Sequence, residues 1–167
     1  EIEVAGACLV PDCDGGLLWA EESVLVVADL HLEKGSSFAA RGVLLPPYDT
    51  AATLARLARL VADFAPRVVV ALGDSFHDGL GGARLSPADR AQLAALQRGR
   101  DWIWIAGNHD PVPMDAVGGS CAEVLAIGAL TFRHCPTGAP GEIAGHLHPV
   151  ARITSRGRTL RRRCFAS

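Results

Sequence analysis

The chain has 167 residues, of which 49% are hydrophobic, and a formal net charge of −2 at pH 7. This length and composition predict one sizeable buried core, so we expect a single domain of the α/β class over residues 1–167. The longest apolar runs are far shorter than the roughly 20 residues that cross a bilayer, and no transmembrane span is predicted. The start of the chain lacks the basic and apolar regions of a secretory signal, so a cytoplasmic location is expected.

Segments with strand and helix patterns alternate along the chain. Residues 4–10 and 17–20 flank a turn-rich segment and predict an opening β-hairpin. Apolar residues at helical spacing predict a helix after Asp49, which is its expected N-cap, and Ser86 with Pro87 predicts the start of a second helix. The further expected strands are residues 24–28, 67–72, 102–106, 124–125, 130–133 and 143–144, with a final hairpin over 152–164.

All six histidines lie in or beside short polar motifs that follow apolar runs. The motifs are Asp29-Leu30-His31, Gly73-Asp74-Ser75-Phe76-His77-Asp78, Gly107-Asn108-His109-Asp110, the isolated His134, and Gly145-His146-Leu147-His148. Loops at the carboxyl ends of parallel strands meet at one edge of a sheet, so we expect these side chains to converge. Carboxylate, amide and imidazole ligands suit Mn²⁺, Fe²⁺ and Zn²⁺, and two such ions can activate water and neutralise phosphoryl oxygens. The sequence therefore predicts a two-metal phosphoesterase.

These five blocks, in this order, resemble the calcineurin-like metallophosphoesterases. The resemblance implies an α/β fold in which a two-sheet β-sandwich is flanked by helices (αββα). It implies that Asp74 bridges two ions, that His109 faces the scissile phosphate, and that Asp110 orients the His109 ring. The implied ligands are Asp29, His31, Asp74 and His148 for one ion, and Asp74, Asn108, His134 and His146 for the other.

Longer stretches around the blocks are more specific. DLHLEKGSSFA over residues 29–39, LLPPYDT over 44–50, GDSFHD, GNHDP, GHLHPVARI and RRRCF resemble the bacterial DNA ligase-associated metallophosphoesterases, also called PdeM. That family implies a manganese-dependent phosphodiesterase or endonuclease that acts on DNA, with a ligase and a helicase as partners in DNA damage repair. Relatives continue beyond the position of Ser167, so the C-terminal part of the second sheet is expected to be incomplete.

Residues near the motifs have several interpretations. His77 and Asp78 have three alternative roles: to orient a metal ligand, to contact substrate, or to cap the loop. Lys34 and Arg41 are candidates for contacts to flanking phosphates, with Ser36 and Ser37 as hydrogen-bond donors, whereas the alternative for Lys34 is a pair with Glu33.

The tail is basic, with six arginines over residues 152–163. It could hold the phosphates of a nucleic acid or be a solvated hairpin, and the sequence favours neither.

The odd number of cysteines, with no Cys-x-x-Cys pair, does not predict a disulfide framework. We expect Cys135, although it follows His134, to be a small buried residue outside the site.

Two other functions remain open from the sequence. A small-molecule phosphodiesterase or nucleotidase would have a closed pocket around the metals, whereas a DNA enzyme would have an open groove. A non-catalytic binding module with this fold is the third reading, and the intact ligand set with His109 argues against it.

Overall fold

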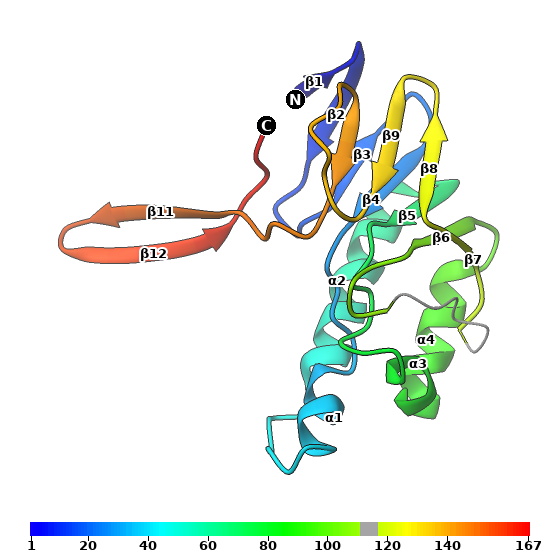
Figure 1. Cartoon of the computed structure of the whole chain (residues 1–167), viewed down its shortest axis with the longest axis vertical. Helices are drawn as coiled ribbons and strands as arrows, with labels where there is room; N and C mark the ends of the chain where they lie inside the picture. Colours follow the sequence, from blue (N-terminus) through cyan, green and yellow to red (C-terminus); the bar gives the residue numbers. More distant parts are fainter. Residues whose placement is uncertain (111–116) are drawn as a thin grey trace.

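The computed structural model describes residues 1–110 and 117–167. A seven-stranded sheet with the order β1-β2-β3-β4-β5-β6-β7 organises the fold (Figure 1). Its first four strands pair antiparallel, and β4 to β7 pair parallel. The strands are β1 Ile2–Val4, β2 Ala7–Pro11, β3 Leu17–Trp19, β4 Val24–Val27, β5 Val68–Ala71, β6 Asp101–Ile105 and β7 Ser120–Ala122.

Helices cover one face of this sheet. Helix α2 (Asp49–Phe64) connects β4 to β5, and α4 (Pro87–Gln97) connects β5 to β6, after the short helices α1 (Lys34–Ala39) and α3 (Gly81–Arg84) respectively. Leucines of α2 and α4 pack against Trp102, Trp104 and the β4 and β5 valines to form one buried cluster. Because β4, β5 and β6 pair parallel, the strand ends that carry the first three motifs lie side by side at one edge of the sheet.

The second sheet covers the opposite face, with the order β10-β9-β8. Its strands are β8 Val124–Ile127, β9 Leu130–Arg133 and β10 Glu142–Ala144. Phe132 and Leu130 are fully buried in a second cluster that joins the two sheets. Beyond it, β11 (Val150–Ser155) and β12 (Arg158–Arg163) form a separate antiparallel hairpin that projects from the body (Figure 1).

The expected α/β class and the two-sheet core are confirmed, and several local predictions are confirmed with them. Ser86 caps α4, because its side chain accepts a hydrogen bond from the Asp89 N–H with Pro87 in the first turn. Of the two expected helical layers, α2 and α4 form one; within residues 1–110 and 117–167, no helix covers the outer face of the second sheet.

Other local predictions were wrong. The single strand expected over residues 4–10 is instead the end of β1, a turn and β2, because Ala5 and Gly6 take positive φ angles of 48° and 82°. Asp49 is the first residue of α2 instead of its N-cap, which is Tyr48. The Asp49 carboxylate accepts a hydrogen bond from the Gly35 N–H at 3.1 Å and so ties α1 to α2.

Within the described residues, no helix has both the length and the apolar character that a membrane span requires.

We predict that Phe132→Ala lowers the free energy of unfolding by about 3–5 kcal/mol, because truncating a fully buried aromatic side chain loses its transfer energy and leaves a cavity between the sheets. Urea denaturation measures the change. Leu44→Ala is the control, since Leu44 is 88% exposed and its truncation should cost less than about 0.5 kcal/mol. An equal effect of the two substitutions would contradict this account of the core.

Candidate metal centre

The first two motifs meet because the pairing of β4 with β5 continues into the loops that follow. Three main-chain hydrogen bonds of 2.9–3.2 Å join the loops, from Asp29 to Gly73, from His31 to Asp74 and from Leu32 to Ser75. The first polar side chain of each motif therefore lies at the same edge of the sheet, as the strand-end argument predicts.

A first group of side chains consists of Asp29, His31, Asp74 and His148, which each offer one ligand atom, all within 4.8 Å of one another. The carboxylates of Asp29 and Asp74 are buried. The His148 Nε2 lies 3.6 Å from Asp29 Oδ1, and the rings of His31 and His148 stack with centroids 5.4 Å apart.

A second group surrounds His134, which is only 4% exposed at the end of β9. Its Nδ1 lies 2.8 Å from the Leu72 carbonyl oxygen, and because a carbonyl can only accept, Nδ1 carries the proton. The lone pair of Nε2 then points toward His146 Nδ1 at 3.2 Å and Asp74 Oδ2 at 3.4 Å. Asn108 adds its amide group, 3.1 Å from His146 Nδ1.

Asp74 lies between the two groups. Its Oδ1 accepts a hydrogen bond from the His109 N–H at 2.9 Å, while its Oδ2 lies beside His134. One carboxylate thus reaches both sets of ligand atoms from a position that is 2% exposed.

Several of these residues have a strained backbone conformation. Non-glycine residues with positive φ include Asp29, His31, Asp74, His146 and His148, with values from 44° to 68°. Such conformations cost roughly 1–3 kcal/mol each and persist where the surrounding structure enforces them, which is typical of functional sites.

Two glycines leave the space that the site requires. A Cβ on Gly73 would lie 2.6 Å from His134 Nδ1, and a Cβ on Gly107 would collide with the Asp74 main chain and carboxylate. Both glycines of the GD and GN motifs are therefore needed so that loops from different strands can pack around the carboxylate.

The donors present fit divalent cations. Burial lowers the pKa of His31 to about 4, so its ring is neutral near pH 7 and offers a lone pair. Its buried Nδ1 has no hydrogen-bond partner among the described residues. The imidazole nitrogens of His134 and His146 face each other and a carboxylate, an arrangement that a cation would stabilise.

The His109 ring is held by a different partner from the expected one. Its Nδ1 donates to the His77 carbonyl oxygen at 3.1 Å, which leaves Nε2 facing the open side of the site, 3.9 Å from Asp74 Oδ2. Asp110, the expected partner of the His109 ring, instead accepts hydrogen bonds from the Ser75 and Phe76 N–H groups. Asp110 therefore holds the loop after β5, and burial raises the pKa of its carboxyl.

The His77 ring stacks on two neighbouring rings, with centroids 5.4 Å from that of His109 and 5.5 Å from that of Phe38. The Asp78 carboxylate accepts two hydrogen bonds of 2.8 Å from Arg84. Burial raises the pKa of Asp78, but its hydrogen bonds outweigh this effect and lower the pKa to about 2. Asp78 therefore fixes the loop that carries His77.

Lys34 and Arg41 are exposed. The pKa of His77 is lowered first by burial, then by His109, and to a smaller extent by the charges of Lys34 and Arg41. The Glu33 carboxylate binds Ser36 and Thr50 instead, and within the described ranges no ion pair joins it to Lys34. Of the two serines that the sequence suggested as hydrogen-bond donors, Ser36 donates to Glu33, and Ser37 is buried.

Cys135 was expected to be buried and is exposed. Its Sγ lies 3.8 Å from Asn108 Oδ1 and within 4.8 Å of the ligand atoms of His134 and His146. One feature of the sequence indicated that Cys135 lies near the site, namely its position directly after His134. The expectation of burial came instead from the general tendency of free cysteines to be buried.

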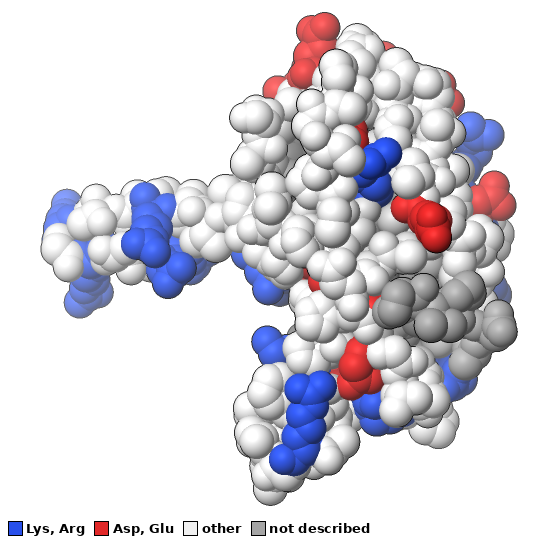
Figure 2. All heavy atoms as spheres, in the orientation of Figure 1, with Lys and Arg blue, Asp and Glu red and all other residues white. Residues whose placement is uncertain are grey.

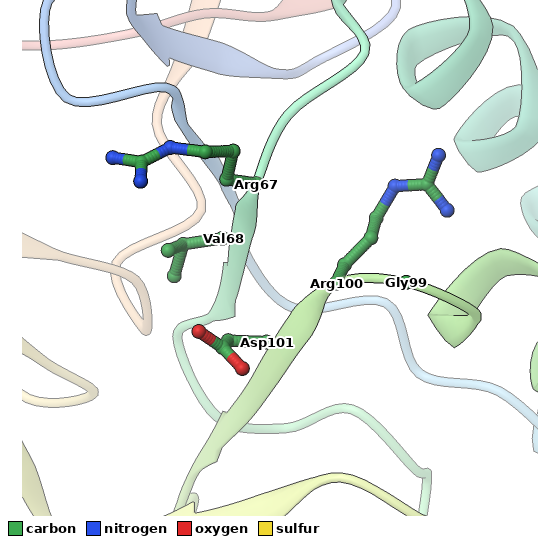
Figure 3. Close-up of a pocket in the computed structure, with 5 residues that line it drawn as sticks. All are labelled: Arg67, Val68, Gly99, Arg100 and Asp101. Carbon is green, nitrogen blue, oxygen red and sulfur yellow. The ribbon is translucent and has the colours of Figure 1, made fainter.

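A hollow of about 510 Å³ lies at the other end of the sheet, where β5 and β6 begin, lined by Arg67, Val68, Gly99, Arg100 and Asp101 (Figure 3). Because the motifs follow the opposite ends of these strands, this hollow is separate from the metal centre.

Comparisons with known proteins identify the family and the fold. A family model described as calcineurin-like phosphoesterase matches residues 23–156. Among solved structures, a nuclease named MPE from Pseudomonas putida is similar with 30% sequence identity and a TM-score of 0.74, over 98% of this chain and 79% of that one. No curated protein matches significantly.

We predict that Gly107→Ala weakens divalent metal binding by roughly 10–100-fold, because the new Cβ displaces Asp74 or the loop that carries Asn108. Titration calorimetry with Mn²⁺ measures the affinity. Gly79→Ala is the matched control, since nothing lies within 4 Å of its added Cβ. Wild-type affinity in Gly107→Ala would show that the close packing at this glycine is not required.

Proposed function

Because this chain belongs to the calcineurin-like phosphoesterase family, we propose that it is a metal-dependent endonuclease that hydrolyses phosphodiester bonds of DNA. The observation that carries the proposal is the pair of ligand groups that share the buried Asp74 carboxylate. Two adjacent cation positions are the arrangement used for phosphoryl transfer to water.

The ligand set of the proposal follows the two groups. Asp29, His31, Asp74 and His148 would hold one cation, and Asp74, Asn108, His134 and His146 would hold the other, so that Asp74 would contribute to both sites. When bound, the cations supply positive charge to the phosphoryl oxygens and lower the pKa of water. Mn²⁺ is the proposed ion, with Fe²⁺ and Zn²⁺ as alternatives, because oxygen and imidazole ligands accommodate all three.

His109 is the proposed proton donor to the leaving oxygen. The His77 carbonyl holds its Nδ1–H, so a proton on Nε2 points into the open side of the site, where a scissile phosphate would lie. The ring stacking with His77 restricts rotation of His109 and keeps that direction.

DNA as the substrate is supported by how open the site is and by its cations. Asn108, His109 and His148 are exposed, so a polymer can approach the ligands from solvent, whereas a small-molecule enzyme would enclose them. Lys34 and Arg41, whose charges lower the pKa of His77, are the proposed contacts to flanking phosphates. The similar structure is also named a nuclease.

The proposed biological setting rests on the sequence stretches shared with the ligase-associated family. It includes a cytoplasmic location and a role in DNA damage repair with a DNA ligase and a helicase as partners. Co-purification of those partners with the tagged chain after DNA damage tests this setting independently of the chemistry.

We predict that Asp74→Asn and His109→Ala both abolish Mn²⁺-dependent hydrolysis of bis-p-nitrophenyl phosphate and of labelled DNA, for different reasons. Asp74→Asn should lose bound metal, because the shared carboxylate charge disappears. His109→Ala should keep its metal and lose roughly 10²–10⁴-fold in kcat, because only the proton donor is removed. Metal content is measured by elemental analysis beside the kinetics.

The outcomes separate the functions left open by the sequence. Cleavage of the small diester without cleavage of DNA would favour a small-molecule phosphodiesterase. Binding of DNA without hydrolysis of either substrate would favour a binding module. Full activity in His109→Ala would contradict the role given to that residue.

A further inference from the structure

The hairpin of β11 and β12 begins two residues after His148, one of the residues of the metal centre. A hydrogen bond of 3.1 Å from the Cys164 N–H to the Pro149 carbonyl closes its base. From that base the hairpin extends away from the body, and basic side chains, all of them arginines in the sequence, line it (Figure 2). A chain segment attached at the metal centre therefore carries the strongest positive charge of the sequence.

The strand register sorts these charges onto two faces. Arg152 lies directly opposite Arg161, Thr154 opposite Thr159, and Val150 opposite Arg163. Because side chains alternate along a strand and opposite partners share a face, one face carries Arg152, Arg161 and Arg163 with both threonines. We call this set the basic face. Ile153 and Leu160 lie on the other face, together with Arg158 and Arg162.

The basic face has a charge that no acidic side chain among the described residues neutralises. Like charges directly opposite each other destabilise an antiparallel pair, and Arg152 and Arg161 are such a pair. The sequence has no acidic residue after Glu142, and within the described residues no ion pair involves an arginine of the hairpin. All three arginines of the basic face are exposed. An anion between them would remove the repulsion.

We propose that the basic face binds the phosphodiester backbone of a DNA strand that continues outward from the metal centre. The inference rests on the proposed function, because the strand is that enzyme's substrate. Arg161 and Arg163 are two residues apart and so about 6.8 Å apart along the strand, a spacing suited to successive phosphates of an extended nucleic acid. Arginines supply the charge, and the hydroxyls of Thr154 and Thr159, 3.0 Å apart, supply further hydrogen bonds.

In this role, the hairpin binds the DNA backbone and does not contact the reacting atoms. Phosphate contacts position a strand without reading its sequence, so the basic face should raise affinity for DNA of any sequence. Hydrolysis of a small diester, which has no flanking phosphates, should not depend on the basic face.

The test compares two variants with equal loss of charge. Arg152→Gln/Arg161→Gln neutralises the basic face, and Arg158→Gln/Arg162→Gln neutralises the opposite face. Binding of a fluorescent oligodeoxynucleotide is measured against salt concentration with Mn²⁺, in the His109→Ala background so that the DNA stays intact. The basic-face variant should bind about tenfold more weakly near physiological salt, with a slope of log K on log salt reduced by about 1.4, corresponding to two lost phosphate contacts. The control variant should bind like its parent.

Equal weakening of DNA binding by both variants would overturn the inference, because it would mean that net charge alone matters. Unchanged DNA binding in the basic-face variant would overturn it as well.

Circular dichroism and thermal unfolding confirm that both variants fold. Each pair is also assayed with intact His109 on bis-p-nitrophenyl phosphate, where both should retain wild-type rates. If the wild type hydrolyses diesters but the variants bind DNA alike, only the hairpin inference fails. If the wild type hydrolyses neither substrate, the proposed function itself fails.

Discussion

The buried carboxylate of Asp74 is the group around which the rest of the site is arranged. It receives the His109 N–H on one oxygen and faces His134 with the other, and the Gly107 main chain packs directly against it. Burying an unpaired carboxylate in this position would cost much free energy. The hydrogen-bond donors around Asp74, and a cation bound beside it, would offset that cost. The nearby Asp110 carboxylate holds the main chain that follows Asp74, which keeps the same loop in place.

Stability and function conflict at this edge of the sheet. Left-handed conformations at five of the motif residues each cost free energy, whereas the helices and the second sheet bury the leucines, tryptophans and Phe132 that offset this cost. The strain is located in loops that follow β4, β5 and β10, and the strands themselves are regular. The cores on both faces of the large sheet therefore support a site whose own backbone is unfavourable.

The sequence predicted the features that depend on local pattern. Strand-end motifs, the alternation of strands and helices and the Ser86 cap follow from residue spacing, and the shared edge follows from parallel pairing. Features that depend on tertiary packing could not be predicted. Asp110 bonds to the main chain of a different motif, Cys135 is exposed beside Asn108, and α1 is a short helix with glycine and serines that starts after a left-handed Glu33. Strand β7 has three residues and little apolar signal, so only its pairing with β6 defines it.

The two sheets contribute different residues to the metal centre. Asp29 and Asp74 follow strands of the large sheet, whereas His134 and His146 follow β9 and β10 of the small one. A cation held by both sets therefore links the two layers of the sandwich across their common core. By mass action, a bound cation would stabilise the packing of the two sheets by RT ln(1 + [L]/Kd), where [L] is the free metal concentration. The apparent melting temperature would therefore depend on that concentration. A chelator would then act as a mild denaturant of the interface between the sheets.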